Sequence, residues 1–114
     1  MEVTEGLLWS RSCEIAARVY RLLAQLPDRG FADRILCTTL TIPERVAARM
    51  AAAGRGEPGL HGPAIVESLT VLQTQLYLAS ECGLVARDES YRLCFEAARL
   101  AERFAETQSV RLPR

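Results

Sequence analysis

The sequence predicts an all-α protein, an antiparallel up-down-up-down four-helix bundle that forms a single domain over residues 1–114. Three observations lead to this prediction. Apolar residues recur at three- and four-residue steps, the period of one helix face, in four segments: roughly 7–26, 30–53, 61–82 and 87–107. Gly- and Pro-containing turns separate the segments. Apolar residues make up 49% of the chain and aromatic residues only 6%, so the core must be aliphatic and rich in alanine.

The first two segments carry one apolar stripe each. The stripe of 7–26 consists of Leu8, Ser12, Ile15, Val19, Leu22 and Leu26, and it stops at the turn Pro27-Asp28-Arg29-Gly30. On the polar side of this segment, Glu14 and Arg18 have the i,i+4 spacing of an ion pair. The stripe of 30–53 consists of Phe31, Ile35, Thr39, Ile42, Val46 and Met50.

Pro43 lies inside the second stripe and allows two interpretations. Within one helix, it would remove the hydrogen bond to the Thr39 carbonyl and kink the helix, at a cost of about 3 kcal/mol. Alternatively, Thr41 to Glu44 reads as a capping box that starts a new helix, with Pro43 in its first turn. The second version leaves a helix of fewer than three turns before it, and the stripe passes Pro43 without a change of phase. We therefore expect one helix kinked at Pro43.

The second half of the chain repeats this plan after a connection at 54–63, which holds four glycines and two prolines. The third segment has heptad-like spacing at Ile65, Leu69, Leu72, Leu76 and Ala79. Gly83 is placed to end that helix in a left-handed conformation. The last stripe consists of Cys94, Ala97, Ala101 and Phe104.

No group of residues indicates catalysis or a metal site. Cys13, Cys37, Cys82 and Cys94 include no CxxC pair, the spacing typical of zinc sites, so we expect all four to pack in the core. His61 is the single histidine and lies in the glycine-rich connection, where nothing would hold it against a nucleophile. We expect no enzyme activity and no cofactor.

Charge and hydropathy favour a soluble, cytoplasmic protein. No apolar run approaches the ~20 residues that cross a bilayer, and the N-terminus lacks the basic region of a secretion signal. The 14 basic and 14 acidic residues cancel, which weakens the case for non-specific binding to nucleic acid.

Two surfaces of the predicted bundle are candidates for interaction. A row of arginines on the second helix and just beyond it could contact RNA or DNA phosphates, or form a solvated or ion-paired face: Arg34, Arg45, Arg49 and Arg55. The third helix has apolar residues beside its core stripe, which predict a subunit interface or else a wider core contact: Val66, Val71, Tyr77, Leu78 and Cys82.

Parts of the second and third helices resemble a known family. The residues that carry the resemblance are Ile42, Pro43, Val46, Ala47, Ser68, Leu69, Leu72, Gln75, Leu76, Leu78, Ala79, Gly83 and Leu84. The chain, over roughly residues 8–106, resembles the four-helix-bundle proteins encoded in intervening sequences of bacterial 23S rRNA genes. The resemblance implies a bundle that assembles into five-membered rings. It also implies a relation to accessory proteins of diversity-generating retroelements, which bind nucleic acid.

These observations together predict a non-enzymatic homo-oligomer, a pentameric ring by the resemblance, that serves as an interaction or scaffold module. The alternative is a nucleic-acid-binding accessory protein that uses the arginine row. The biological role is not contained in the sequence.

Overall fold

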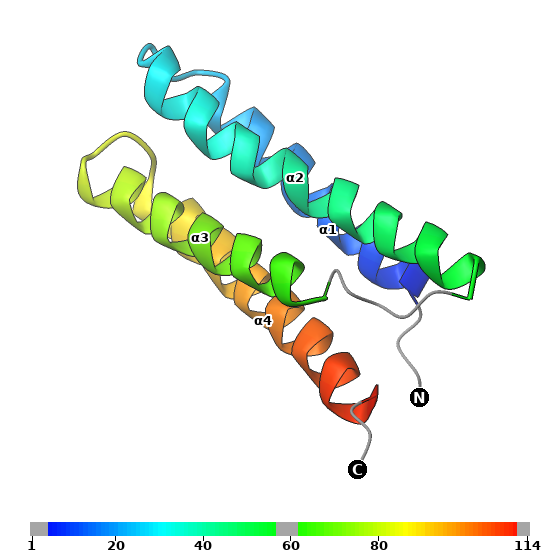
Figure 1. Cartoon of the computed structure of the whole chain (residues 1–114). Coiled ribbons are helices and arrows are strands. Elements are labelled where there is room, and N and C mark those ends of the chain that lie inside the picture. Colours follow the sequence, from blue (N-terminus) through cyan, green and yellow to red (C-terminus); the bar gives the residue numbers. More distant parts are fainter. Residues whose placement is uncertain (1–4, 57–61, 112–114) are drawn as a thin grey trace.

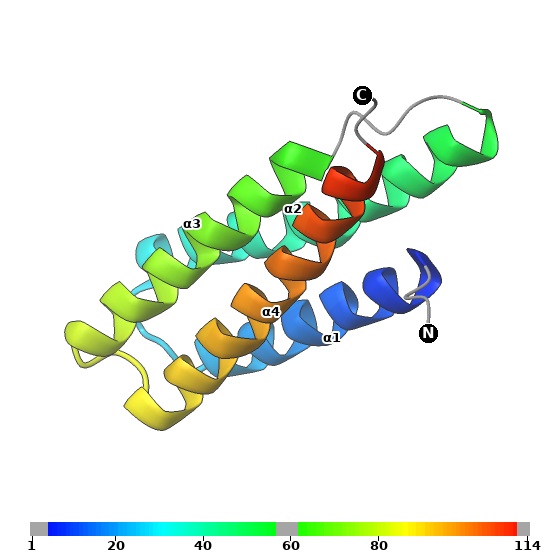
Figure 2. The same cartoon turned by 90° about the horizontal axis from the view of Figure 1, so that it is seen from below.

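The computed structural model describes residues 5–56 and 62–111, and in this part of the chain it contains four α-helices and no strand. The helices are α1 (Glu5–Leu23), α2 (Arg29–Gly54), α3 (Gly62–Glu81) and α4 (Arg87–Arg111). Figures 1 and 2 show α1 beside α2 and α3 beside α4. In addition α2 packs against α3, and α1 packs against α4 over the smallest contact. The predicted all-helical class is confirmed, and the helix contacts fit a bundle.

One apolar core joins all four helices. Each helix contributes side chains at three- and four-residue spacing, and those that are fully inaccessible include Val19, Ile35, Leu72, Leu76, Leu93 and Phe104. On α4 the expected stripe is partly wrong, because Leu93 and Leu100 are buried whereas Cys94 and Ala101 are only half-buried. The core is mostly aliphatic, as the low aromatic content predicts. Each fully buried side chain of this size contributes about 1.5–3 kcal/mol relative to an exposed one.

The turn between α1 and α2 is held by side chain and backbone together. α1 ends at Leu23, three residues before the expected Leu26. Leu26 itself directly precedes Pro27, a position that disfavours helical dihedrals. The Asp28 carboxylate caps α2 by accepting from the Phe31 amide at 3.1 Å. The guanidinium of Arg29 donates to the Leu26 carbonyl at 2.9 Å. The turn residues thus satisfy helix-end groups that would otherwise be unpaired.

α3 ends at Glu81, and Gly83 follows in the helix-stopping role that the sequence predicts. Gly83 has φ of 75°, in the left-handed region that other residues avoid. Its amide donates to the Ser80 carbonyl, and the Leu84 amide donates to the Ala79 carbonyl at 2.9 Å. This pair of bonds is the Schellman motif. Leu84 then packs against the core, which fixes the direction in which the chain leaves α3.

α2 is a single helix that includes Pro43. The alternative in which a new helix starts at Thr41 is therefore wrong. The Thr41 hydroxyl does not cap a helix but donates to the Cys37 carbonyl one turn earlier, at 2.7 Å. His61 and most of the connection before it lie outside the described residues.

Candidate interaction groove between α2 and α3

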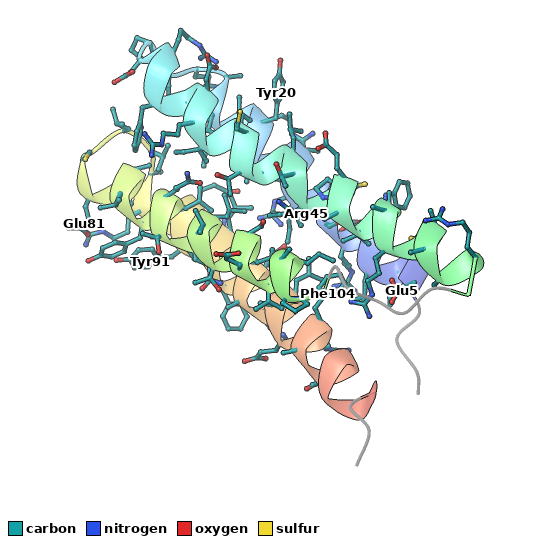
Figure 3. All side chains as sticks on the ribbon, in the orientation of Figure 1. Glu5, Tyr20, Arg45, Glu81, Tyr91 and Phe104 are labelled. Carbon is teal, nitrogen blue, oxygen red and sulfur yellow. The ribbon has the colours of Figure 1, made fainter. Side chains whose placement is uncertain are left out.

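An open groove of about 310 Å³ runs between α2 and α3. Its lining comes from Cys37, Thr38, Thr41 and Arg45 on α2, and from Glu67, Ser68 and Val71 on α3. Several of these residues are four apart on their helix, so each wall is one helix face. Figure 3 shows Arg45 on the part of α2 that lies next to α3. The groove therefore combines a predicted nucleic-acid residue, Arg45, with a predicted interface residue, Val71.

The two charged residues of the groove have no ion-pair partner within the described part of the chain. Arg45 and Glu67 are both exposed and face the same groove from opposite helices. The threonines of the α2 wall direct their hydroxyl protons into their own helix: Thr41 to the Cys37 carbonyl, and Thr38 to the Arg34 carbonyl at 3.4 Å. The groove thus offers one cation and one anion whose charges are not neutralised by a neighbour.

The four candidate arginines do not form one surface. Arg34 is exposed on α2 outside the groove lining, and Arg55 is exposed at the C-cap of α2. Arg49, by contrast, is only 3% exposed. The expectation that it belongs to a solvent-facing arginine row is therefore wrong.

Arg49 is instead a charged residue of the core. Its Nη2 lies 3.0 Å from Oε2 of Glu5, in the first turn of α1, and its guanidinium carbon lies 5.3 Å from the Phe104 ring centroid on α4. A buried guanidinium requires such compensation because removing a charge from water is costly. Nη1 of Arg49 and Oε1 of Glu5 nevertheless have no hydrogen bond to any described residue. The pair is therefore only half satisfied.

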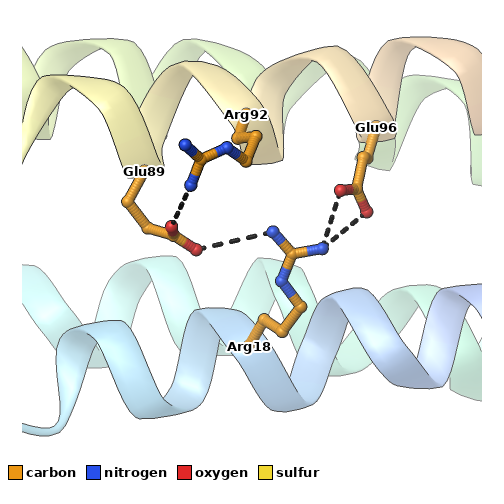
Figure 4. A network of polar contacts seen from close by, with 4 residues as sticks. All are labelled: Arg18, Glu89, Arg92 and Glu96. Atoms are coloured by element: carbon orange, nitrogen blue, oxygen red, sulfur yellow. Dashed lines mark hydrogen bonds and ion pairs between the residues drawn. The ribbon is translucent and has the colours of Figure 1, made fainter.

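A second arginine joins α1 to α4. Arg18 lies with Nη1 2.7 Å from both carboxylate oxygens of Glu96 and with Nη2 3.5 Å from Glu89, which also accepts from Arg92 at 3.1 Å (Figure 4). The hydrogen bond to Glu96 raises the pKa of Arg18, although partial burial opposes that effect. Arg18 was expected to pair with Glu14, which is exposed; its partners lie on another helix.

The predicted interface residues of α3 fall into two groups. Val71, Tyr77 and Leu78 are 42%, 48% and 47% exposed, and Cys82 is exposed as well. Val66 is half-buried and packs against the core, so most of its surface is used within the chain.

The expectation that all four cysteines pack in the core is wrong. Cys37 and Cys82 are exposed, whereas Cys13 and Cys94 are half-buried. Cys37 lies two residues from both Ile35 and Thr39, which places it on the opposite side of α2 from these core residues. The Cys94 thiol donates to the Gln73 carbonyl at 3.4 Å across the α3–α4 contact, and burial raises its pKa.

Within residues 5–56 and 62–111, no three His, Cys, Asp or Glu side chains are grouped so that they could hold a metal ion. None of the helices in these two ranges combines the length and hydropathy needed to cross a membrane.

No protein-family model matches the chain, and no curated protein and no solved structure is significantly similar to it.

Proposed function

We propose that the protein is a non-enzymatic helical interaction module that associates with copies of itself through α3. The observation that carries the proposal is the exposure of Val71, Tyr77 and Leu78, each between 42% and 48%, on a helix that also supplies five fully buried apolar side chains. A helix that is apolar on most of its circumference is normally covered on most sides. In a single chain, the outer side of α3 has no such cover.

Most exposed apolar side chains outside α3 make a weaker case, since isolated ones are common on protein surfaces. α1, for example, exposes Tyr20, and α2 exposes Leu40. The exception is α4, where Tyr91 and Phe95 lie one turn apart and are 45% and 63% exposed. On α3 the three exposed residues lie within eight positions, and Val71 and Leu78 are two helical turns apart on the same face. Grouped apolar surface of this kind is typical of protein–protein contacts.

The fold through which α3 acts is, in this proposal, an antiparallel up-down-up-down bundle with α2 kinked at Pro43. Contact between each helix and the next one in the chain supports this topology. The position of Pro43 inside α2 supports the kink, because a proline ring crowds the carbonyl four residues earlier, here that of Thr39.

Light scattering on the purified protein tests the proposal. We expect a mass that is a multiple of 12.6 kDa and falls toward that value on dilution. Leu78→Asp should shift the equilibrium toward the monomer because it places a charge in the contact. Leu40→Asp is the matched control, since Leu40 is 49% exposed on α2. A wild-type protein that remains at 12.6 kDa at every concentration would refute self-association.

The subunit number follows from the same measurement. The pentameric ring implied by the family resemblance would weigh about 63 kDa, five times the chain mass. A ring needs two different contact surfaces per chain, whereas a dimer needs one self-complementary surface.

Nucleic-acid binding is the alternative proposal, and it now rests on Arg34, Arg45 and Arg55. Because Arg49 is buried, less positive charge is available on this surface to bind phosphates. If the arginines bind RNA or DNA, a gel shift should show a complex at low salt that weakens steeply as salt increases, and Arg34→Ala should weaken it. Absence of a complex at low salt would rule this function out.

A further inference from the structure

The groove between α2 and α3 contains two opposite charges, Arg45 and Glu67, that have no ion-pair partner among the described residues. Some other exposed arginines of the described helices have carboxylate neighbours, such as Arg29 with Asp33 at 3.5 Å and Arg92 with Glu89 at 3.1 Å. Others, namely Arg11, Arg21 and Arg34, have no such neighbour among the described residues. Arg45 and Glu67 have none, although both line one groove. The groove differs from these single positions because it holds an exposed cation and an exposed anion on facing walls.

Arg45 and Glu67 lie at the same end of the groove, on opposite walls. Along the chain, Arg45 is the last groove residue of α2 and Glu67 is the first groove residue of α3. Figure 1 shows that α3 begins at the end of the molecule where α2 ends. Val71, which is 42% exposed, lies one turn farther along the α3 wall and gives the groove an apolar contact next to the charges.

This arrangement is self-complementary. A twofold rotation about an axis along the groove exchanges its walls, so the α2 wall of one copy covers the α3 wall of the other. Arg45 of each copy then faces Glu67 of the other, and Val71 is covered by the opposite α2. A purely acidic ligand would satisfy only Arg45, and a purely basic one only Glu67. A second copy of this chain satisfies both.

We propose that two copies pair across the α2–α3 groove about such a twofold axis, joined by two symmetry-related Arg45–Glu67 ion pairs around Val71. This inference rests on the proposed self-association and specifies its contact. It differs from a ring contact because the same surface is used by both copies. Like charges placed opposite each other in a contact are strongly unfavourable, which makes the arrangement testable by charge reversal.

The test uses Arg45→Glu and Glu67→Arg, each alone and as an equal mixture, with the dimer dissociation constant measured by sedimentation at low salt. Each variant alone places like charges in both pairs, so we expect its dissociation constant to rise about tenfold or more. In a mixed dimer, Glu at position 45 of the first variant faces Arg at position 67 of the second. The native Glu67 of the first variant also faces the native Arg45 of the second. Heterodimers should therefore form with nearly the wild-type affinity.

Matched controls are Arg34→Glu on α2 and Glu102→Arg on α4, both exposed and outside the groove, which should dimerise as the wild type does. Circular dichroism of each variant checks that it is folded. A wild type that never associates overturns the self-association itself. A wild type that associates but is unaffected by either reversal, or single variants that are weakened and not rescued by mixing, overturns the twofold groove contact while leaving self-association standing.

Discussion

Two arginine–glutamate pairs hold α1 in the bundle, and they lie in very different surroundings. Arg18 binds Glu96 and Glu89 on α4, and its side chain is 29% exposed. Arg49 binds Glu5, its side chain is 4% exposed, and it stacks on Phe104. The first pair spans the smallest helix contact in the bundle at the protein surface. In the second pair the guanidinium is buried, whereas the Glu5 side chain is 34% exposed.

The difference shows how burial changes what the same chemistry contributes. Around Arg18, water can replace a lost partner, so the ion pairs add little net free energy. Around Arg49, water is excluded, so a lost partner leaves a charge uncompensated. The unbonded Nη1 of Arg49 and Oε1 of Glu5 show that even the native pair is not fully satisfied. The predictions below test this contrast.

The largest effect is expected from Arg49→Ala. It removes the ion pair and the cation–π contact and leaves a cavity beside Phe104, so we expect a loss of about 3–5 kcal/mol in the free energy of unfolding, measured by urea denaturation. Arg49→Met is the informative control because it keeps the side-chain length without the charge. It should cost clearly less than Arg49→Ala. An equal loss in both variants would show that the charge, and not the packing, stabilises this site.

Glu5→Gln should have the next largest effect. It preserves size but removes the charge opposite Arg49, and we expect a loss of about 1–3 kcal/mol because a buried charged donor loses its partner. Glu14→Gln provides the baseline, since Glu14 lies exposed on the same helix and should change stability very little. If the two variants lose equal stability, the Glu5–Arg49 pair does not stabilise the fold.

Arg18→Ala should cost about 1 kcal/mol or less at low salt. Because the network is at the surface, the loss should shrink further as ionic strength rises, whereas the loss in Glu5→Gln should change little. Urea denaturation of the wild type, Arg18→Ala and Glu5→Gln at two salt concentrations makes this comparison. A salt-independent loss in Arg18→Ala would mean that the network is shielded from solvent.

The smallest effect concerns the reactivity of the thiols. Cys37 and Cys82 are exposed, whereas burial raises the pKa of Cys94, so Cys94 has less thiolate at a given pH. Alkylation by iodoacetamide, followed by mass spectrometry, should therefore modify Cys37 and Cys82 well before Cys94. Equal alkylation rates for Cys94 and Cys37 would contradict the packing of α4 against α3.

The raised pKa of Cys94 also predicts a dependence of stability on pH. As the pH rises above the ordinary thiol pKa, the thiol of the unfolded chain ionises before that of the folded chain, so the free energy of unfolding should fall.

The sequence predicts the features that depend on local pattern. The stripe that includes Leu69 and Leu72 follows from helical periodicity, and the termination of α3 before Gly83 follows from the conformational freedom of glycine. These signals lie within a few residues of one another, so no tertiary information is needed to read them.

Features that depend on pairing between distant segments were beyond local reasoning. Arg18 meets Glu96 across 78 positions of the chain, while Glu14 offered a plausible local partner. Arg49 follows Ile42 and Val46 at helical steps of four and three, a spacing that could have placed it in the core. Its charge argued for the surface instead, because a buried arginine requires partners that only the folded structure supplies.

The groove is another property of the assembled helices. Neither Arg45 nor Val71 indicates by its local sequence that the two line one surface.

Sedimentation equilibrium of the wild-type protein over a wide concentration range tests the central claim most directly. Self-association through the uncovered side of α3 predicts a mass that rises above 12.6 kDa with concentration and is reduced by Leu78→Asp. A mass of 12.6 kDa at all concentrations, for a protein shown to be folded, would contradict it.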